Sequence, residues 1–233
     1  MALTLALVGG FVDAVGYITL LGVFIAHMSG NSAAMGAHLG QGKTAAALAR
    51  AAPIPLFVAG VGGGAMLIEV LTRRGVRSTA AVVLGLEAGL LLAVLVVGDA
   101  TLSHGVVDAQ KGWAFYGLIV LAATAMGLQT SALRRLAGQT VRTTFVTGML
   151  THLGEEAAKF VLPSSRRSAS GSRLRLLTLI WICYASGAVL GGWAHDQWSL
   201  NALVVPLVIL VGVIAVDLVR PIHGPGDRAL AEV

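Results

Sequence analysis

Charge is scarce in this sequence. Asp, Glu, Lys and Arg make up 12% of its 233 residues, whereas charged residues are about 25% of an ordinary soluble protein. Hydrophobic residues make up 56%, and the mean hydropathy is +0.84. This composition excludes an ordinary soluble domain and predicts an all-α integral membrane protein, with the lipid bilayer as its main partner.

Cysteine is almost absent as well. The single cysteine, Cys183, lies inside an apolar run, which excludes a disulfide framework and a thiolate metal site. No nucleotide-binding fingerprint occurs, because the glycines of residues 60–64 lie within an apolar run. Ser29 or Ser32 with His27 lacks a nucleophile elbow and a third orienting residue. We therefore predict no enzymatic activity and no cofactor.

The remaining charge is biased toward the positive. Lys and Arg number 16 against 11 Asp and Glu, which gives a formal net charge of +5. The basic residues cluster in the connections between apolar runs, and aromatic residues are not interleaved with them. This pattern is typical of a cytoplasmic membrane face. We predict no nucleic-acid partner.

Several apolar runs are long enough to cross a bilayer, which takes about 20 residues. Six segments qualify: 2–21, 54–71, 79–97, 113–133, 174–193 and 203–219. Two further stretches, 23–39 and 145–161, are rich in small residues and too short or too polar to be safe spans. They are either re-entrant short helices or continuous with neighbouring spans. Counting them as full spans would place a strong arginine cluster outside, so we expect short re-entrant helices.

The basic residues also predict an orientation, because Lys and Arg mark short cytoplasmic loops. Six spans with both termini in the cytoplasm place two arginine clusters inside. These clusters are Arg73, Arg74 and Arg77, and Arg134, Arg135, Arg166, Arg167, Arg173 and Arg175. Lys43 and Arg50, in the first connection, are the exception.

An internal repeat is suggested by two similar segments. Residues 10–31 resemble residues 127–149 in the order of a Gly-containing span and a later [Ser/Thr]-Gly step. Three spans per copy would make the copies inverted, an organisation of many secondary transporters. The alternative is that any two Gly/Ala-rich membrane helices look alike. We predict one membrane domain over 1–222, with repeats at about 5–98 and 113–219 and a flexible cytoplasmic tail at 223–233.

Glycines recur in the second and fifth predicted spans. Gly60 and Gly64, and likewise Gly187 and Gly191, are four residues apart. Small residues at this spacing let two helix backbones approach closely. We interpret these glycines as packing contacts rather than as parts of a binding site.

Asp13 is the first functional candidate. It lies in an apolar run that extends from residue 2 to about residue 26. A charge at that depth costs at least about 2.5 kcal/mol, so it needs a partner, a proton or a water-lined cavity. Glu87, midway along the third span, is a second and weaker candidate for a proton relay.

Hydroxyl and amide groups follow both predicted breaks. Ser29-Gly30-Asn31 stands at the expected start of a short helix, where N–H groups and the helix dipole favour anions. The alternative is that Ser and Asn only cap this helix. Arg142 offers a counter-charge to an anion or to Asp13, or else it faces lipid headgroups. The predicted pathway residues are Asp13, Tyr17, His27, Ser29, Gly30, Asn31, Gln129, Thr130, Arg142, Thr143, Thr144, Thr147 and Gly148.

A metal site is the remaining possibility among the polar residues. His152, Glu155 and Glu156 fall on one helix face. No second histidine lies nearby in sequence, and the acids can pair with Lys159 instead. We predict no metal ligands.

Four motifs in order carry a family likeness. They are the residues of 10–17, Met28-Ser29-Gly30-Asn31, Gly127-Leu128-Gln129 and those of 142–148. Together they resemble the YoaK-like family of small bacterial membrane proteins over residues 5–219. The resemblance implies a bacterial inner-membrane location and no particular substrate. Thr130-Ser131 departs from the Asn-Ala pair expected at that point, which puts a role for an amide there in doubt.

Together these features predict a secondary transporter for a small polar or anionic solute, with Asp13 as a proton or cation site. A non-transporting membrane scaffold or sensor is the alternative, and a channel or membrane-embedded enzyme is third. The scaffold predicts that Asp13 pairs internally, for example with Arg134 or Arg142. A homo-oligomer is compatible with each of these.

Overall fold

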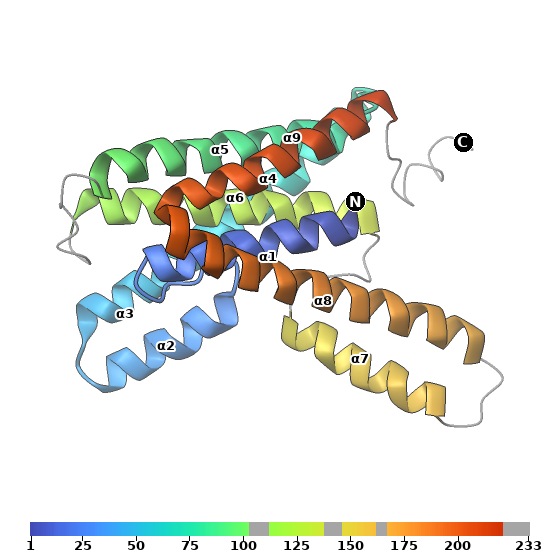
Figure 1. Ribbon diagram of the computed structural model, residues 1–233, viewed down its shortest axis with the longest axis horizontal. Helices are drawn as coiled ribbons and strands as arrows, with labels where there is room; N and C mark the ends of the chain where they lie inside the picture. Colours follow the sequence, from blue (N-terminus) through green and yellow to red (C-terminus); the bar gives the residue numbers. More distant parts are fainter. Residues whose placement is uncertain (103–111, 138–145, 162–166, 221–233) are drawn as a thin grey trace.

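The computed structural model describes residues 1–102, 112–137, 146–161 and 167–220. These residues form nine α-helices and one short 3-10 helix (Figure 1). In chain order they are α1 (Ala2–Thr19), α2 (Met28–Gly40), α3 (Thr44–Ala51), α4 (Pro53–Arg73), α5 (Thr79–Leu102), α6 (Trp113–Ala137), α7 (Val146–Val161), α8 (Arg167–Trp198), η1 (Ser199–Leu203) and α9 (Val204–Val219). The described part of the chain is all-helical, as its composition predicts.

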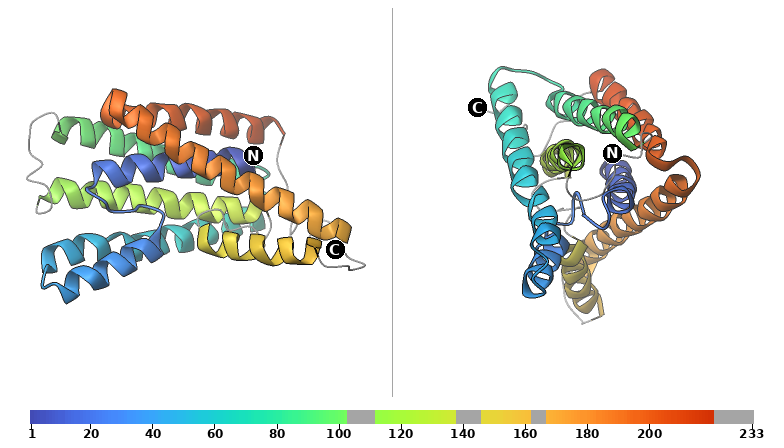
Figure 2. Two further views of the ribbon diagram at one scale, coloured as in Figure 1. Left: turned by 60° about the horizontal axis from the view of Figure 1, so that its bottom comes forward. Right: turned by 90° about the vertical axis from the view of Figure 1, so that its left-hand side faces the viewer.

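The six predicted apolar segments correspond to α1, α4, α5, α6, α8 and α9. By length and hydropathy, five stretches of the described residues could cross a membrane, and the last of them, Leu174–Val219, contains both α8 and α9. The chain reverses direction between these two helices, at η1 (Figures 1 and 2). The structure therefore supports a multi-pass arrangement of apolar helices.

Two helices are enclosed by the others. Within their apolar windows, 67% of α6 and 56% of α1 is buried, against 17% of α4. Figure 2 shows α1 and α6 inside the ring that the other helices make. Side chains of α1 and α6 therefore face protein, whereas most of α4 is left to face lipid.

Glycines bring α1 against α8. An ideal Cβ on Gly10 would come closer than 3.0 Å to the carbonyl oxygen of Tyr184. A Cβ on Gly187 would come equally close to the carbonyl oxygen of Leu7. Only glycine lets the two backbones approach this closely, so the predicted packing role of Gly187 is confirmed.

The contact between α4 and α6 has the same form. A Cβ on Gly127 would come closer than 3.0 Å to the carbonyl oxygen of Phe57. A Cβ on Gly60 would meet the carbonyl oxygen of Thr124 in the same way. The predicted packing role of Gly60 is therefore also confirmed.

The two short helices, α2 and α7, lie on the same side of the bundle. Both begin toward the middle of the molecule and run outward in opposite directions (Figures 1 and 2). They have 13 and 16 residues, which at about 1.5 Å per residue makes both shorter than the roughly 30 Å hydrocarbon layer. Neither can cross a bilayer alone as a straight helix.

Two details of this region differ from the sequence prediction. The first short helix begins at Met28, not at residue 23, because residues 24–26 are bound as a loop by side chains of α1 and α2. The sequence also does not predict α3, which leads into α4 through Ala52. Pro53 occupies the first position of α4, where a helix needs no N–H donor.

Candidate functional site

The connection between α1 and α2, residues 20–27, is a loop held by hydrogen bonds from side chains of several helices. It begins with Leu21 and Gly22 in left-handed conformations, with φ angles of 53° and 82°. Glycine adopts this region freely, whereas leucine does so at a cost. The loop therefore needs side-chain contacts to hold its shape, and they come from α1, α2, α3 and α8.

Asp13 makes the first set of these contacts. It is 3% exposed, and its Oδ1 accepts hydrogen bonds from the backbone N–H groups of Ile25 at 3.0 Å and Ala26 at 2.9 Å. A loop crossing the protein interior would otherwise leave these donors unsatisfied. The carboxylate of α1 therefore sets the path of the chain into α2.

The other oxygen of Asp13 meets two titratable side chains. Oδ2 lies 2.6 Å from Nδ1 of His27 and accepts a hydrogen bond of 2.8 Å from the hydroxyl of Tyr184 in α8. That hydroxyl is 3.0 Å from Nδ1 of His27. An ionised carboxylate only accepts, so a proton on Nδ1 binds the pair; if Asp13 is protonated, it donates to Nδ1 instead. Asp13 and His27 can thus share one proton, while the hydroxyl of Tyr184 donates its own to Oδ2.

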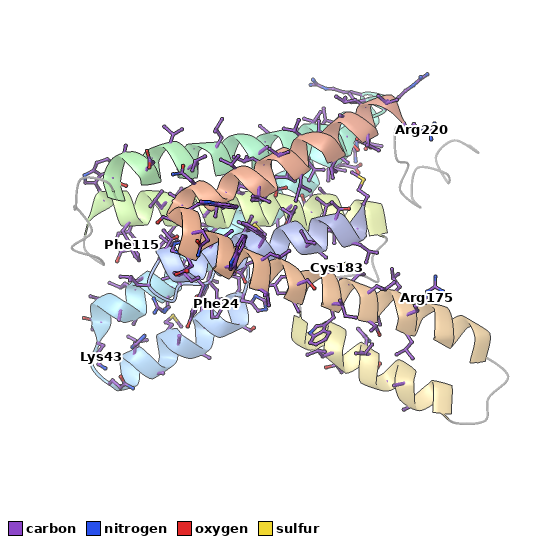
Figure 3. The ribbon with its side chains drawn as sticks, viewed as in Figure 1. Phe24, Lys43, Phe115, Arg175, Cys183 and Arg220 are labelled. Carbon is purple, nitrogen blue, oxygen red and sulfur yellow. The ribbon has the colours of Figure 1, made fainter. Side chains whose placement is uncertain are left out.

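The cluster of Asp13, His27 and Tyr184, named here the Asp13 cluster, reaches the surface through histidine. The side chain of His27 is 24% exposed, against 4% for that of Asp13. Figure 3 labels two residues of this region, Phe24 in the loop and Cys183, which precedes Tyr184 on α8. His27 is therefore the more exposed partner of this pair, and the Asp13 carboxylate is almost wholly enclosed.

Asn31 fixes the same loop from α2. It is fully buried, and its side-chain Oδ1 accepts from the N–H of Phe24 at 3.0 Å while Nδ2 donates to the oxygen of Phe24 at 2.6 Å. The alternative interpretation, that Ser29 and Asn31 only cap the short helix, is wrong, because α2 has no side-chain cap. The side chain of Asn31 instead reaches back from the first turn of α2 to the backbone of the loop.

Arg50 holds the loop from α3. Its Nη2 donates to the carbonyl oxygen of Leu21 at 2.8 Å, and the residue is 9% exposed. The sequence marked Arg50 as an exception to the charge pattern of the loops. Its burial against a carbonyl supplies a structural reason, since this cation is bound inside the protein and not free at a membrane face.

Two predicted pathway residues, Tyr17 and Gly30, pack against the loop. The ring of Tyr17 lies 4.5 Å from that of Phe24 between centroids, and Tyr17 is 43% exposed. A Cβ on Gly30 would lie 3.1 Å from the Phe24 ring. The motifs that surround Asp13 and Asn31 thus include residues that support the turn.

The predicted residues of the second half are only partly described. Arg142, Thr143 and Thr144 lie outside the described residues. Thr147 and Gly148 lie in the first turn of α7. Thr130 on α6 donates to the oxygen of Met126 at 2.8 Å. The Asp13 cluster therefore belongs to α1, α8 and the loop between α1 and α2, and an arginine partner for Asp13 is not among its described contacts.

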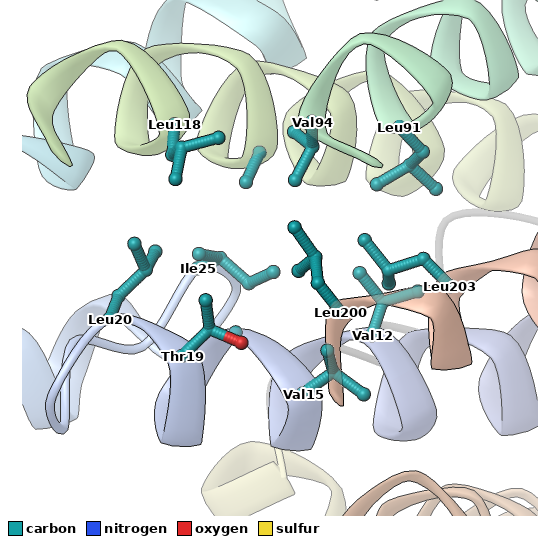
Figure 4. A pocket seen from close by; sticks show the side chains of 12 residues that line it. Val12, Val15, Thr19, Leu20, Ile25, Leu91, Val94, Leu118, Leu200 and Leu203 are labelled. Carbon is teal, nitrogen blue, oxygen red and sulfur yellow. The ribbon is translucent and has the colours of Figure 1, made fainter. Parts of the chain in front are cut away.

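A small apolar pocket lies behind the loop (Figure 4). Its lining comes from α1, α5, α6, η1 and the loop, and Thr19 supplies its one polar side chain. The side chain of Ile25 points into the pocket while its backbone N–H binds Asp13. The loop thus joins the carboxylate to the apolar interior, and any shift of Ile25 changes both.

Two buried residues escape the sequence prediction. Tyr184 lies 171 positions from Asp13, and nothing in its apolar surroundings signals a polar partner. Asp217 of α9 is 1% exposed and accepts from the N–H of Ala81 at 3.0 Å, so it stabilises the start of α5. An acid near the end of an apolar span is the one available signal for Asp217.

The role of Asn31 can be measured directly. We expect Asn31→Ala to lower the free energy of unfolding by about 2 kcal/mol, because a buried N–H and a buried C=O lose their partners. Ser32→Ala is the control, since this exposed hydroxyl bonds only the oxygen of Met28. Denaturant titration in mixed micelles compares the two, and equal small losses would contradict the assignment.

The fold and the site define an all-helical, multi-pass membrane protein whose first helix carries a buried acid. Residues 1–216 match the family described as "Protein of unknown function (DUF1275)", and the chain belongs to that family. It is 25% identical to the UPF0700 transmembrane protein YoaK of Bacillus subtilis (strain 168) over 209 residues, which cover 90% of this chain and 89% of that protein. The resemblance to the YoaK-like family is confirmed. No solved structure matches the chain.

Proposed function

We propose that this protein is a secondary transporter of a small polar or anionic solute, in which the Asp13 cluster couples protonation to the loop between α1 and α2. The observation that supports the proposal is that the two oxygens of one buried carboxylate bind different kinds of partner. Asp13 binds the backbone of Ile25 and Ala26 through one oxygen and two titratable side chains through the other. A proton gained by Asp13 weakens it as an acceptor and so loosens the loop.

Movement of that loop would change access to the interior. Ile25 lines the pocket between α1, α5 and α6, so releasing its N–H from Asp13 lets its side chain leave the pocket. Coupling of this kind needs an element with two arrangements that protonation biases. The loop qualifies because left-handed Leu21 and Gly22 hold it in a conformation that depends on its side-chain contacts.

The close contact of α1 with α8 and that of α4 with α6 are related by constant offsets in sequence number, which supports two inverted repeats. Gly127 lies 117 positions after Gly10, and Tyr184 lies 127 positions after Phe57. The same two offsets relate the contact of Leu7 with Gly187 to that of Thr124 with Gly60. Helix α6 runs opposite to α1, and α8 runs opposite to α4 (Figures 1 and 2). Inverted repeats with broken elements are typical of secondary transporters.

The repeat offsets also explain an asymmetry. An offset of 117 carries Asp13 to Thr130, and an offset of 127 carries Phe57 to Tyr184. The contact between α1 and α8 thus joins an acid to a phenol, whereas the equivalent positions on α6 and α4 carry a hydroxyl and a phenyl ring. In our proposal only the first break responds to protons.

The starts of α2 and α7 supply a place for an anion. Both point toward the middle of the molecule (Figures 1 and 2), and helix starts carry partial positive charge. We propose six crossings, with α8 and α9 as separate passes, both termini in the cytoplasm and the bacterial inner membrane as location. We propose no enzymatic step, and the lipid bilayer and the solute as partners.

A non-transporting scaffold or sensor is the second candidate, and one observation favours it. Asp13 is paired inside the protein, with His27 and Tyr184, as that alternative requires of a structural acid. The pocket behind the loop is apolar, which suits packing better than a polar solute. The two candidates differ in whether the site opens to both sides of the membrane.

Cysteine labelling separates them. In a Cys183→Ser background, Ser29→Cys and Thr147→Cys are treated with a membrane-impermeant maleimide from each side of sealed vesicles. A transporter is expected to be labelled from both sides, because its site opens alternately. Ser32→Cys, on the exposed face of α2, is the matched control and should react from one side only. Labelling of positions 29 and 147 from a single side under all conditions would reject transport.

A further inference from the structure

A second polar pair lies in the core, away from the loop. Glu87 of α5 is 0% exposed and Gln129 of α6 is 2% exposed. Among the described residues, no hydrogen-bond partner is found for either carboxylate oxygen of Glu87 or for Nε2 of Gln129. An unpaired carboxylate inside a membrane bundle is costly, so this arrangement calls for a ligand or a proton.

Helix register places the two residues at one level. Helices α5 and α6 run antiparallel (Figure 1), and a Cβ on Gly98 would lie 3.6 Å from Cδ2 of Leu118, so these two positions share a level. Eleven residues make about three turns. Eleven positions back from Gly98 is Glu87, and eleven forward from Leu118 is Gln129. Both therefore lie at one level and on the faces through which the helices meet.

Helix α1 closes the third side. An ideal Cβ on Gly9 would lie 3.2 Å from Oε1 of Gln129. Gly9 precedes Asp13 by four residues, which is about 6 Å along the helix axis. The pair thus lies one helical turn from the Asp13 cluster without taking part in it.

The donor and acceptor inventory identifies the missing partner. The amide of Gln129 offers an N–H donor and a carbonyl acceptor, so it matches a neutral carboxylic acid with two complementary hydrogen bonds. An ionised Glu87 could accept from Nε2 but would leave Oε1 facing a negative charge. A metal cation would need several more oxygen ligands, and the described residues contain no group of three or more His, Cys, Asp or Glu side chains that could hold a metal ion.

We propose that Glu87 and Gln129 form a proton-binding site in the core, separate from the Asp13 cluster, in which Glu87 carries the proton and pairs with the amide of Gln129. The site goes beyond the proposed transport function, because it would bind its proton whether or not a solute moves.

Other charged groups near α5 are engaged elsewhere. Asp217 of α9 binds the N–H of Ala81, and Glu69 of α4 lies 2.7 Å from Arg73. Between residues 113 and 133 of α6, only Tyr116 is titratable, and it lies near the opposite end of that helix. The titratable groups of α1 are Asp13, which is paired with His27, and Tyr17, which packs on Phe24. No cation in the described structure therefore competes for Glu87.

Infrared spectroscopy tests the proposal without a transport assay. Purified protein in lipid nanodiscs at neutral pH is expected to show the carbonyl stretch of a neutral carboxylic acid. Glu87→Gln should abolish this band, whereas Asp13→Asn should leave it. Gln129→Leu should shift the band to higher frequency, because the acid loses its hydrogen-bonded partner. Gln at position 87 can still pair with Gln129, so that variant is expected to fold.

Isotope labelling keeps the test decisive if a variant fails to fold. Wild-type protein made with carboxyl-labelled [13C]glutamate should show the same band at lower frequency. A neutral-pH spectrum without any glutamate-dependent acid band would overturn the proposal. A labelled band that survives in folded Glu87→Gln would overturn it equally, because another glutamate would then hold the proton.

Discussion

Gly187→Ala is expected to lower the free energy of unfolding by about 3 kcal/mol or more, because its new methyl group meets backbone that cannot turn aside. An ideal Cβ there comes closer than 3.0 Å to the carbonyl oxygen of Leu7. The two helices must separate, which also pulls Tyr184 on α8 away from Asp13. Denaturant titration in mixed micelles measures the loss.

Gly192→Ala, on the same helix, is the matched control. The nearest atom to its ideal Cβ is Cδ1 of Ile18, at 4.0 Å. Alanine also suits a helix better than glycine, by about 1 kcal/mol in peptides. This variant should be neutral or slightly more stable. If both variants behave alike, close packing of α1 on α8 is not what Gly187 provides.

Asp13→Ala is expected to cost about 3–5 kcal/mol, the range for removing one partner from a buried ionic pair. The change strands the N–H groups of Ile25 and Ala26 and the hydroxyl of Tyr184. Asp13→Asn should cost only about 1–2 kcal/mol, because the amide oxygen still accepts from the loop. Unfolding titrations of both variants make the comparison.

The exposed Asp196→Asn removes the same charge from the end of α8 and serves as the control for net charge. It should change stability by less than about 0.5 kcal/mol. The outcome that contradicts the assignment is an Asp13→Ala variant as stable as Asp13→Asn, since the carboxylate would then not hold the loop.

Asp13 and Asn31 could be found from the sequence because each is an anomaly in its surroundings. An ionised acid inside an apolar run has a high free-energy cost. An amide beside a predicted helix break is likewise a candidate for a specific hydrogen bond. Their contacts could not be found. Asn31 looks like a helix cap, and only the fold shows that it binds Phe24 instead. Local sequence cannot tell which backbone a side chain will reach.

Tyr184 could not be predicted, because its polar role depends on a helix contact 171 positions away in sequence. The glycines of α4 and α8 predicted that close helix contacts exist, but not which helices would meet. Once the fold pairs α1 with α8, the phenol and the acid are brought to one level. Long-range pairing of this kind is a property of the packed structure.

The proposed pairing of Glu87 with Gln129 could not be predicted from the sequence either. Glu87 stood out in its span, whereas Gln129 was noticed only as part of a motif. Only helix register indicates that the two residues lie at one level, and the register follows only once α5 and α6 are known to be antiparallel neighbours. The sequence thus finds candidate charges well and finds their partners poorly.

The central claim is that protonation of the Asp13 cluster moves the loop and the start of α2. Its most direct test is the rate of maleimide labelling at Ser29→Cys, in a Cys183→Ser background, across a range of pH. Dividing by the rate at Ser32→Cys removes the titration of the thiol itself. The account predicts a pH-dependent ratio that becomes flat in Asp13→Asn, and a ratio whose pH dependence survives that substitution would contradict it.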